Sequence, residues 1–169
     1  MNASVRTDKQ ALPAEPLSIH HIGFVVADIE AGIKGFVHSL GGHWDGRIFA
    51  DPHQKVRVAF LTIRPGEPQI ELVEAAAEAS PVIRFLREKG GGLHHICYHV
   101  EDLERSLAWM KSRGAILARP PKPAVAFDGR RIAFMLTAEK LLVELLERDV
   151  QTAGSSSDAG ASKPSPRKS

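Results

Sequence analysis

The sequence predicts an α+β protein made of two βαβββ modules that share one core. An internal repeat carries this prediction. The segment IHHIGFVVADIEAGI, from Ile19, reappears from Leu93 as LHHICYHVEDLERSL. Two more pairs follow in the same order, VRVAFLTI with RIAFMLTA and IELVE with VELLE. Chance likeness between short apolar strands would not preserve both order and spacing, so we interpret the chain as two copies of one unit.

Each copy contains the same expected elements. In the first copy, we expect a strand at 20–26, a helix at 29–40, a variable strand, a strand at 56–63 and a last strand at 69–73. In the second copy, the corresponding elements are a strand at 94–100, a helix at 103–113, a variable strand, a strand at 131–136 and a last strand at 141–146. Alternating apolar residues indicate the strands. Asp28 and Asp102 are placed to cap the helices, and Gly41 and Gly114 are placed to end them.

The segment SPVIRFLREKGGG joins the two copies. Ser80 is the expected helix cap, Pro81 suits the first turn, and the glycines end the helix. The predicted organisation is a flexible N-terminal arm (1–16), a first module (17–75), a linker helix (76–92), a second module (93–148) and a disordered tail (149–169) that is too polar to bury a core.

Composition excludes several classes of protein. The 169 residues suffice for one domain, and 43% hydrophobic with 25% charged residues is ordinary for a soluble globular protein. A net charge of +2 gives no case for a nucleic-acid partner. No apolar run reaches the roughly 20 residues of a membrane span. The N-terminus lacks the apolar segment of a secretory signal, and Cys97 is the only cysteine, so we expect a cytoplasmic protein without disulfides.

Strand alternation assigns side chains to faces. In the first strand, His20 should share a face with Ile22, while His21 should share the other with Gly23, whose small size leaves room for a binding cup. Cys97 has the corresponding place in the second copy, where we interpret it as a small filler and not as a nucleophile.

Glu71 and Glu144 lie at equivalent places in the two last strands, each between apolar neighbours. A carboxylate there is costly to bury unless it is paired, protonated or bound to a metal. With His21 and His95 they make a set of two imidazoles and two carboxylates, which would converge if the modules pack with pseudo-twofold symmetry. Such a set suits a divalent ion of Co, Mn, Zn, Ni or Fe.

Four cationic side chains could meet an anionic substrate, although each alone is more often a solvated charge. They are Arg57, Lys122, Arg130 and Arg131.

The paired HHI strands, the ELVE and ELLE strands and the linker resemble the vicinal oxygen chelate superfamily, which includes glyoxalase I, extradiol dioxygenases and bleomycin-type resistance proteins. The likeness runs over 17–147 and is greatest to methylmalonyl-CoA epimerases, in the segments ELVEAAAEASPVIRFL, GGLHHI and DGRRIAF. The resemblance implies a U-shaped, partly open mixed β-sheet cup, a homodimer, and His21, Glu71, His95 and Glu144 as metal ligands. Val58 stands where some members have a second catalytic glutamate.

The expected function is a metal-dependent epimerase that moves the α-proton of an acyl thioester. The metal would stabilise negative charge on the substrate's oxygen atoms. Glu144 is the expected acid/base on one face, and His53 or His99 on the other, since imidazole titrates near neutral pH. The alternatives are a glyoxalase I-like lyase, an Fe(II) dioxygenase and a non-catalytic drug-binding resistance protein. Dioxygenases of this kind need one carboxylate, which makes the second glutamate an argument against them.

Overall fold

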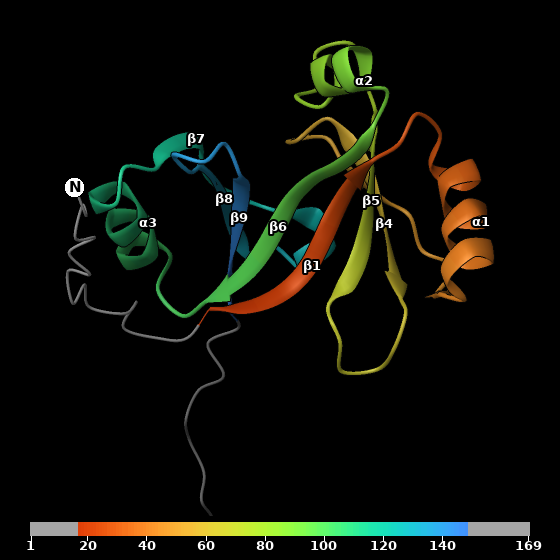
Figure 1. The fold of residues 1–169 in the computed structure, drawn as a ribbon, viewed down its shortest axis with the longest axis horizontal. Coiled ribbons are helices and arrows are strands. Elements are labelled where there is room, and N and C mark those ends of the chain that lie inside the picture. The colour runs from red at the N-terminus through yellow and green to blue at the C-terminus, as the bar shows by residue number, and fades with distance from the viewer. Residues whose placement is uncertain (1–16, 149–169) are drawn as a thin grey trace, which may run out of the picture.

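A computed structural model describes residues 17–148, and its nine strands form one mixed sheet around a concave face (Figure 1). The strand order is β2-β4-β5-β1-β6-β9-β8-β7, with β3 added on β4. The central strands β1 and β6 pair in antiparallel orientation. On its other side, β1 pairs in parallel with β5, and β6 pairs in parallel with β9, each from its own half of the chain. The sheet is thus arranged symmetrically about the β1–β6 seam, and the predicted α+β class is confirmed. The arm at 1–16 and the tail at 149–169 lie outside the described residues.

The first half contains β1 (Ser18–Val25), α1 (Ile29–Leu40), β2 (His43–Trp44), β3 (Phe49–Asp51), β4 (Val56–Thr62) and β5 (Gln69–Ala75). The second contains β6 (Gly92–Val100), α3 (Leu103–Ser112), β7 (Ile116–Pro123), a short 3-10 turn (Val125–Phe127), β8 (Arg131–Leu136) and β9 (Leu142–Glu147). Helix α2 (Ile83–Lys89) lies between the halves. The expected variable strand is split into β2 and β3 in the first half and is one longer strand, β7, in the second.

Both predicted aspartate caps are present. The carboxylate of Asp28 accepts a hydrogen bond from the Ala31 amide at 2.7 Å, and that of Asp102 accepts one from the Arg105 amide at 2.9 Å. The prediction for Ser80 was wrong, because α2 begins three residues later and Val82 occupies its cap position. Instead of capping the helix, the Ser80 hydroxyl is buried without a hydrogen-bond partner in the described part of the chain.

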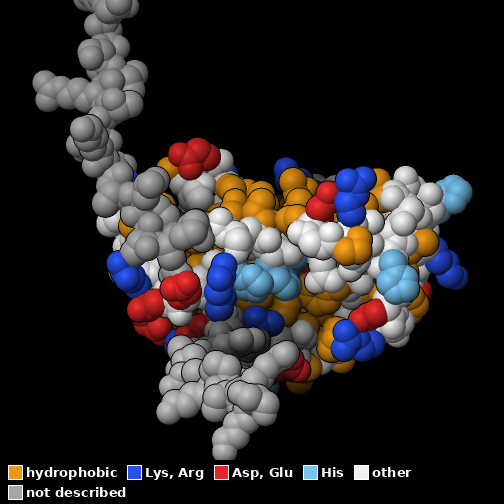
Figure 2. Space-filling view, turned by 90° about the horizontal axis from the view of Figure 1, so that it is seen from below, with side chains coloured by type: hydrophobic (Ala, Val, Ile, Leu, Met, Phe, Trp, Pro, Cys, Tyr) orange, Lys and Arg blue, Asp and Glu red, His pale blue; other side chains and the backbone are white. Residues whose placement is uncertain are grey.

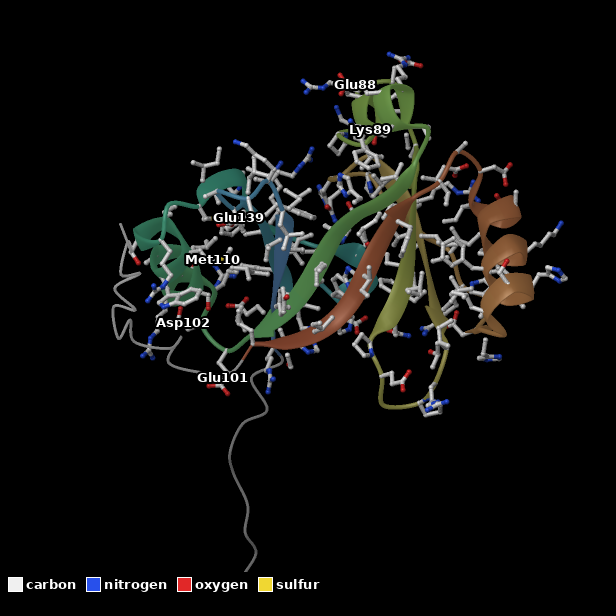
Figure 3. The ribbon with its side chains drawn as sticks, viewed as in Figure 1. Glu88, Lys89, Glu101, Asp102, Met110 and Glu139 are labelled. Carbon is white, nitrogen blue, oxygen red and sulfur yellow. The ribbon has the colours of Figure 1, made fainter. Side chains whose placement is uncertain are left out.

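Helices α1 and α3 pack on the sheet at opposite ends of the molecule (Figure 1). Ile29 and Ile33 of α1 are buried in a cluster with residues of β4 and β5. Leu107 and Met110 of α3 are buried in a second cluster with residues of β8 and β9, and Met110 lies between helix and sheet in Figure 3. None of the helices in 17–148 has both the length and the apolarity of a membrane span.

Each half also carries one arginine that bridges two glutamates. Arg57 contacts Glu30 of α1 and Glu74 of β5. At the corresponding place in the second half, Arg131 contacts Glu104 of α3 and Glu147 of β9, both at 2.6 Å. Each triad ties a helix N-terminus to the last strand of its half, so the repeat extends to the surface electrostatics.

Candidate metal centre

The four predicted donor side chains come together on the concave side of the seam. The Nε2 atoms of His21 and His95 lie 3.1 Å apart. One oxygen of Glu144 is 3.0 Å from both nitrogens, and one oxygen of Glu71 is 3.3 Å and 3.2 Å from them. All four residues are at most 6% exposed. The two halves therefore supply one imidazole and one carboxylate each to a single buried cluster.

These spacings fit a divalent cation. With metal–ligand bonds of about 2.0–2.2 Å, adjacent ligand atoms lie about 2.8–3.6 Å apart in octahedral or tetrahedral coordination. The nitrogen–oxygen distances of 3.0–3.3 Å fall in that range. All four candidate ligand atoms lie within 4.8 Å of one another. Two buried carboxylates this close to one centre also need positive charge nearby, which a cation supplies.

In the protein without a cation, protons on the two histidines supply that charge. Burial alone would lower the pKa of His21, but the charge of Glu71 and the hydrogen bond that His21 donates to Glu144 outweigh it and raise the pKa to about 9. The balance is the same at His95, where the two carboxylates raise the pKa to about 10. Burial would raise the pKa of Glu71, yet the neighbouring histidines hold it well below its usual range. The two carboxylates therefore favour positive charge at the centre of the cluster.

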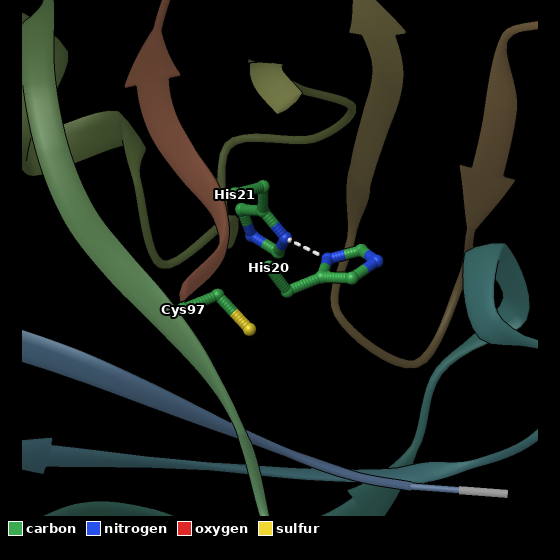
Figure 4. Close-up of side chains that lie close together, drawn as sticks. All are labelled: His20, His21 and Cys97. Carbon is green, nitrogen blue, oxygen red and sulfur yellow. Dashed lines mark hydrogen bonds between the residues drawn. The ribbon is translucent and has the colours of Figure 1, made fainter. Parts of the chain in front are cut away.

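A β-bulge in each central strand orients the histidine pairs. In the β1–β6 ladder, Ile19 pairs with Tyr98 and His21 pairs with Cys97, which leaves His20 as an extra residue. Residue 94 is the extra one in β6. The prediction that His20 faces away from His21 was wrong, since regular alternation does not hold across a bulge. His20 Nδ1 lies 2.8 Å from His21 Nδ1 (Figure 4).

The first histidine of each pair supports the second. The Nδ1 atoms of His94 and His95 lie 3.0 Å apart, as in the other pair. Burial, reinforced by the charge on the neighbouring histidine, lowers the pKa values of His20 and His94 to about 4. These rings are therefore neutral at neutral pH, and each can accept a hydrogen bond from the adjacent Nδ1–H group. That contact leaves Nε2 of the second histidine directed at the cation position.

Small residues make room for these rings, whereas we expected them to leave space for a binding cup. Gly23 pairs with His95 across the seam, and a Cβ atom at position 23 would collide with the His95 ring. Cys97 pairs with His21 and is fully buried beside it (Figure 4). Burial and the nearby glutamates raise the pKa of the Cys97 thiol well above its usual value, which supports the interpretation of this residue as a filler.

A cavity of about 460 Å³ opens onto the cluster, and Glu71, His95 and Glu144 form part of its wall. Phe127 and Phe134 add apolar surface to the wall. The ring of Phe127 stacks on His21, with centroids 5.8 Å apart, and Phe134 meets His95 edge-on. On the face seen in Figure 2, histidine side chains lie together among hydrophobic ones. The cavity can therefore hold a small molecule against the four donors.

The other sequence candidates have different surroundings. His53 is exposed and lines a smaller hollow beside the cavity. The ring of His99 packs on His20, with centroids 4.5 Å apart, and His99 is not among the residues that line the cavity. Val58 is buried and lines the cavity. The structure thus brings the four donors together and leaves His53 and His99 outside the main cavity.

Of the four arginines and lysines predicted to meet an anion, Arg57 and Arg131 are held in the glutamate triads described above. Arg130 stacks on the Phe127 ring at 5.6 Å and donates to the Phe127 carbonyl. Lys122 lines the small hollow.

Among the residues of the cavity wall that sequence reasoning missed are three with ionisable side chains, Asp51, His94 and Arg119. Asp51 is 3% exposed, and its carboxylate accepts hydrogen bonds from the Gln54 amide and side chain and from the Val125 amide. It thereby ties the first half to the second across the cavity. The histidine doublet was a usable signal for His94, whereas nothing local in the sequence marked the other two.

Comparison with known proteins places this geometry in a family. Residues 20–134 match the Glyoxalase/Bleomycin resistance protein/Dioxygenase superfamily. The chain is 31% identical over 118 residues to ethylmalonyl-CoA/methylmalonyl-CoA epimerase of Cereibacter sphaeroides, covering 69% of this chain and 86% of that protein. The crystal structure of methylmalonyl-CoA epimerase from Mycobacterium tuberculosis is 27% identical, with a TM-score of 0.69 over 82% of this chain and 93% of that one.

A methylmalonyl-CoA epimerase solved in complex with methylmalonyl-CoA and NH4+ has a TM-score of 0.68, at 25% identity and 80% coverage of this chain and 97% of the other. The superfamily match covers more than half of the chain, and the nine-stranded cup agrees with these neighbours in fold. The chain therefore belongs to the glyoxalase/bleomycin resistance protein/dioxygenase superfamily and is an epimerase-like member of it.

Proposed function

We propose that the protein is a metal-dependent epimerase that moves the α-proton of an acyl thioester, with His21, Glu71, His95 and Glu144 as the ligands of the cation. The observation that carries the proposal is the convergence of these four buried donors on the wall of a cavity large enough for an acyl group. A divalent cation bound there would stabilise the negative charge that develops on the substrate's oxygen atoms when the α-proton leaves.

Glu144 is the proposed proton acceptor on one face of the α-carbon. Its carboxylate lines the cavity, and hydrogen bonds from His21 and His95 hold it in place. Inversion also requires a second proton carrier on the opposite face. His53 is the better of the two predicted candidates, because it borders the hollow that adjoins the cavity, whereas His99 packs against His20.

The apolar part of the wall has its own role in this proposal. Phe127, Phe134 and Val58 line the cavity near the donors and keep bulk water from the reacting carbon. Exclusion of water strengthens the electrostatic interactions on which proton abstraction depends. The hydrogen bond from the Val125 amide to the Asp51 carboxylate connects the two halves of the chain beside this wall.

The related epimerases support this choice of substrate class, since one of them carries methylmalonyl-CoA in its structure. The presence of two carboxylates in the cluster favours it over an Fe(II) dioxygenase, for which two histidines and one carboxylate suffice.

The test is α-proton exchange. The protein is loaded with Co²⁺ or Mn²⁺ and incubated with racemic methylmalonyl-CoA in deuterated water, and deuterium at the α-carbon is followed by mass spectrometry. We expect incorporation far above the uncatalysed rate, and its loss after chelation. Incorporation no faster than in the chelated protein would reject the proposed function and leave the family assignment intact.

A further inference from the structure

The cavity above the metal cluster continues into a second, smaller hollow. Gln54, Arg119 and Phe134 line both spaces. The main cavity has the candidate metal ligands in its wall, while the hollow of about 60 Å³ is lined by the basic side chain of Lys122 and by His53, with no acidic residue among its lining residues. A ligand that reaches from one space into the other would therefore pass from the cation position to a positively charged end.

Arg119 is the charged side chain among the three that line both spaces, and its charge has no counterpart among the described residues. It is partly buried on β7, and within 17–148 the structure gives it no hydrogen bond and no ion pair. Burial lowers its pKa, and no acidic neighbour counteracts that shift. A guanidinium held partly out of water without an anion is costly, and arginine's planar fork suits carboxylate and phosphate oxygens.

Other charged residues of the cavity wall are already satisfied. Arg84 forms an ion pair with Glu88 on α2 at 3.0 Å, and its side chain is 84% exposed. Asp51 accepts the three hydrogen bonds described above and forms no ion pair with Arg119. The Arg119 guanidinium can therefore bind an anionic group of a ligand in the cavity.

The backbone of β7 brings Arg119 and Lys122 to the same side. In a regular strand, residues three apart point to opposite faces. Here Arg119 pairs with Phe134 and Lys122 pairs with Ile132, so three steps on β7 match two on β8. This bulge, at the Pro120–Pro121 pair, reverses the alternation, and both basic side chains line the hollow.

We propose that Arg119, with Lys122 beside it, forms an anion-binding subsite for a charged group of the ligand whose acyl end lies at the metal cluster. The shared chemistry is an anionic oxygen group, which could be a phosphate of the thioester's carrier arm or a free carboxylate of its acyl group. The inference rests on the proposed function only in taking the ligand to be such a thioester.

The experiment compares binding to the Co²⁺-loaded wild type and to Arg119→Gln by calorimetry. The probes are coenzyme A, pantetheine, which lacks the phosphates, and methylmalonate, which carries the carboxylates alone. Loss of a charge-assisted hydrogen bond should weaken binding about tenfold. A loss for coenzyme A with pantetheine unchanged supports the inference with phosphate as the source. A loss for methylmalonate with coenzyme A unchanged supports it with carboxylate as the source.

Two further variants keep the result interpretable. Arg105→Gln removes the same charge from an exposed position on α3 and should leave all three affinities within about twofold of wild type. Lys122→Gln should weaken the same probe as Arg119→Gln, by a smaller factor, because lysine acts as a point charge without bidentate geometry. Thermal unfolding checks that each variant is folded.

The inference is overturned if Arg119→Gln and Lys122→Gln bind every probe as Arg105→Gln does, or if the wild type binds none of the three. Its failure is distinguishable from that of the proposed function. Binding that depends on Arg119 in a protein without α-proton exchange would reject the function and keep the subsite. α-Proton exchange in the wild type, together with variants that bind every probe as Arg105→Gln does, would keep the function and reject the subsite.

Discussion

The imidazole of His95 occupies the space in which a side chain at position 23 would lie, so the absence of a side chain at Gly23 is a structural requirement of the cluster. The two residues face each other across the β1–β6 seam. His21 and Cys97 repeat the relationship with the halves exchanged. Each half thus makes room for the histidine of the other.

Gly23→Ala should weaken cation binding. The added methyl group must displace the His95 ring, and a ligand moved from its place lowers metal affinity, by about tenfold or more when the surrounding contacts are also disturbed. Competition with a chelating dye measures the affinity. Gly35→Ala is the matched control, because a Cβ there meets nothing within 4 Å. It should keep the affinity and stabilise α1 by about 0.5–1 kcal/mol. Equal affinities in the two variants would contradict the prediction.

Glu144→Gln and Glu71→Gln should differ in activity. Both keep an oxygen that can bind the cation, and both remove one buried charge. If Glu144 also carries the α-proton, its amide should lower the rate of α-deuterium exchange by about 10²–10⁴. Glu71→Gln should lower the rate much less. Rates are compared at equal metal content, determined by elemental analysis, and similar losses in both variants would argue that Glu144 acts as a ligand alone.

The protein without a cation should lose stability as the pH rises. The pKa values of His21 and His95 are about 9 and 10 in the folded chain, above their ordinary value of 6.5. A raised folded-state pKa stabilises the fold fully below pH 6.5, and this contribution disappears as the pH rises through 9 to 10. The depressed pKa of Glu71 acts in the opposite direction, with a contribution that is present above pH 4.5 and lost in acid.

Urea unfolding in the presence of a chelator, at several pH values from 6 to 10, measures this dependence. We expect the free energy of unfolding to fall across that range. With Co²⁺ bound, the cation replaces the protons, so the decline should be much smaller and the gap between loaded and chelated protein should widen with pH. A flat profile for the chelated protein would show that the histidines are not charged in the fold.

Cys97 should resist alkylation in the folded protein. The thiolate is the reactive form, and burial raises the pKa of this thiol well above its usual value. Labelling by iodoacetamide at pH 8 should therefore be slow in buffer and fast in urea, with mass spectrometry as the readout. Cys97→Ala should retain most of the α-proton exchange. Rapid labelling of the folded chain, or a large loss of exchange, would assign the thiol a chemical role.

The repeat made much of the fold predictable, because each element of one half had a partner to check it against. Helix α1 and strand β8 begin and end where the sequence predicted. The start of α2 was missed, because a serine followed by a proline resembles a capped helix start even where, as here, the helix begins a few residues later.

The cluster was predictable because costly residue types recur at equivalent places in the two halves. The position of His20 was not, since a bulge depends on how two strands pair, and a single strand carries no sign of it. Arg119 was missed for a related reason, because its exposure to the cavity depends on a bulge against β8. The homodimer, the cytoplasmic location and the roles of His53 and His99 stay predictions.

The position of the cluster on the β1–β6 seam would couple the release of a bound cation to the opening of that seam. His21 and Glu71 belong to one half, and His95 and Glu144 to the other, so parting the two strands splits the ligand set in a single event. A bound cation should accordingly slow solvent hydrogen exchange at the backbone amides of β1 and β6 more than at those of the outer strands. The ion would then act as a reversible cross-link between the two repeats.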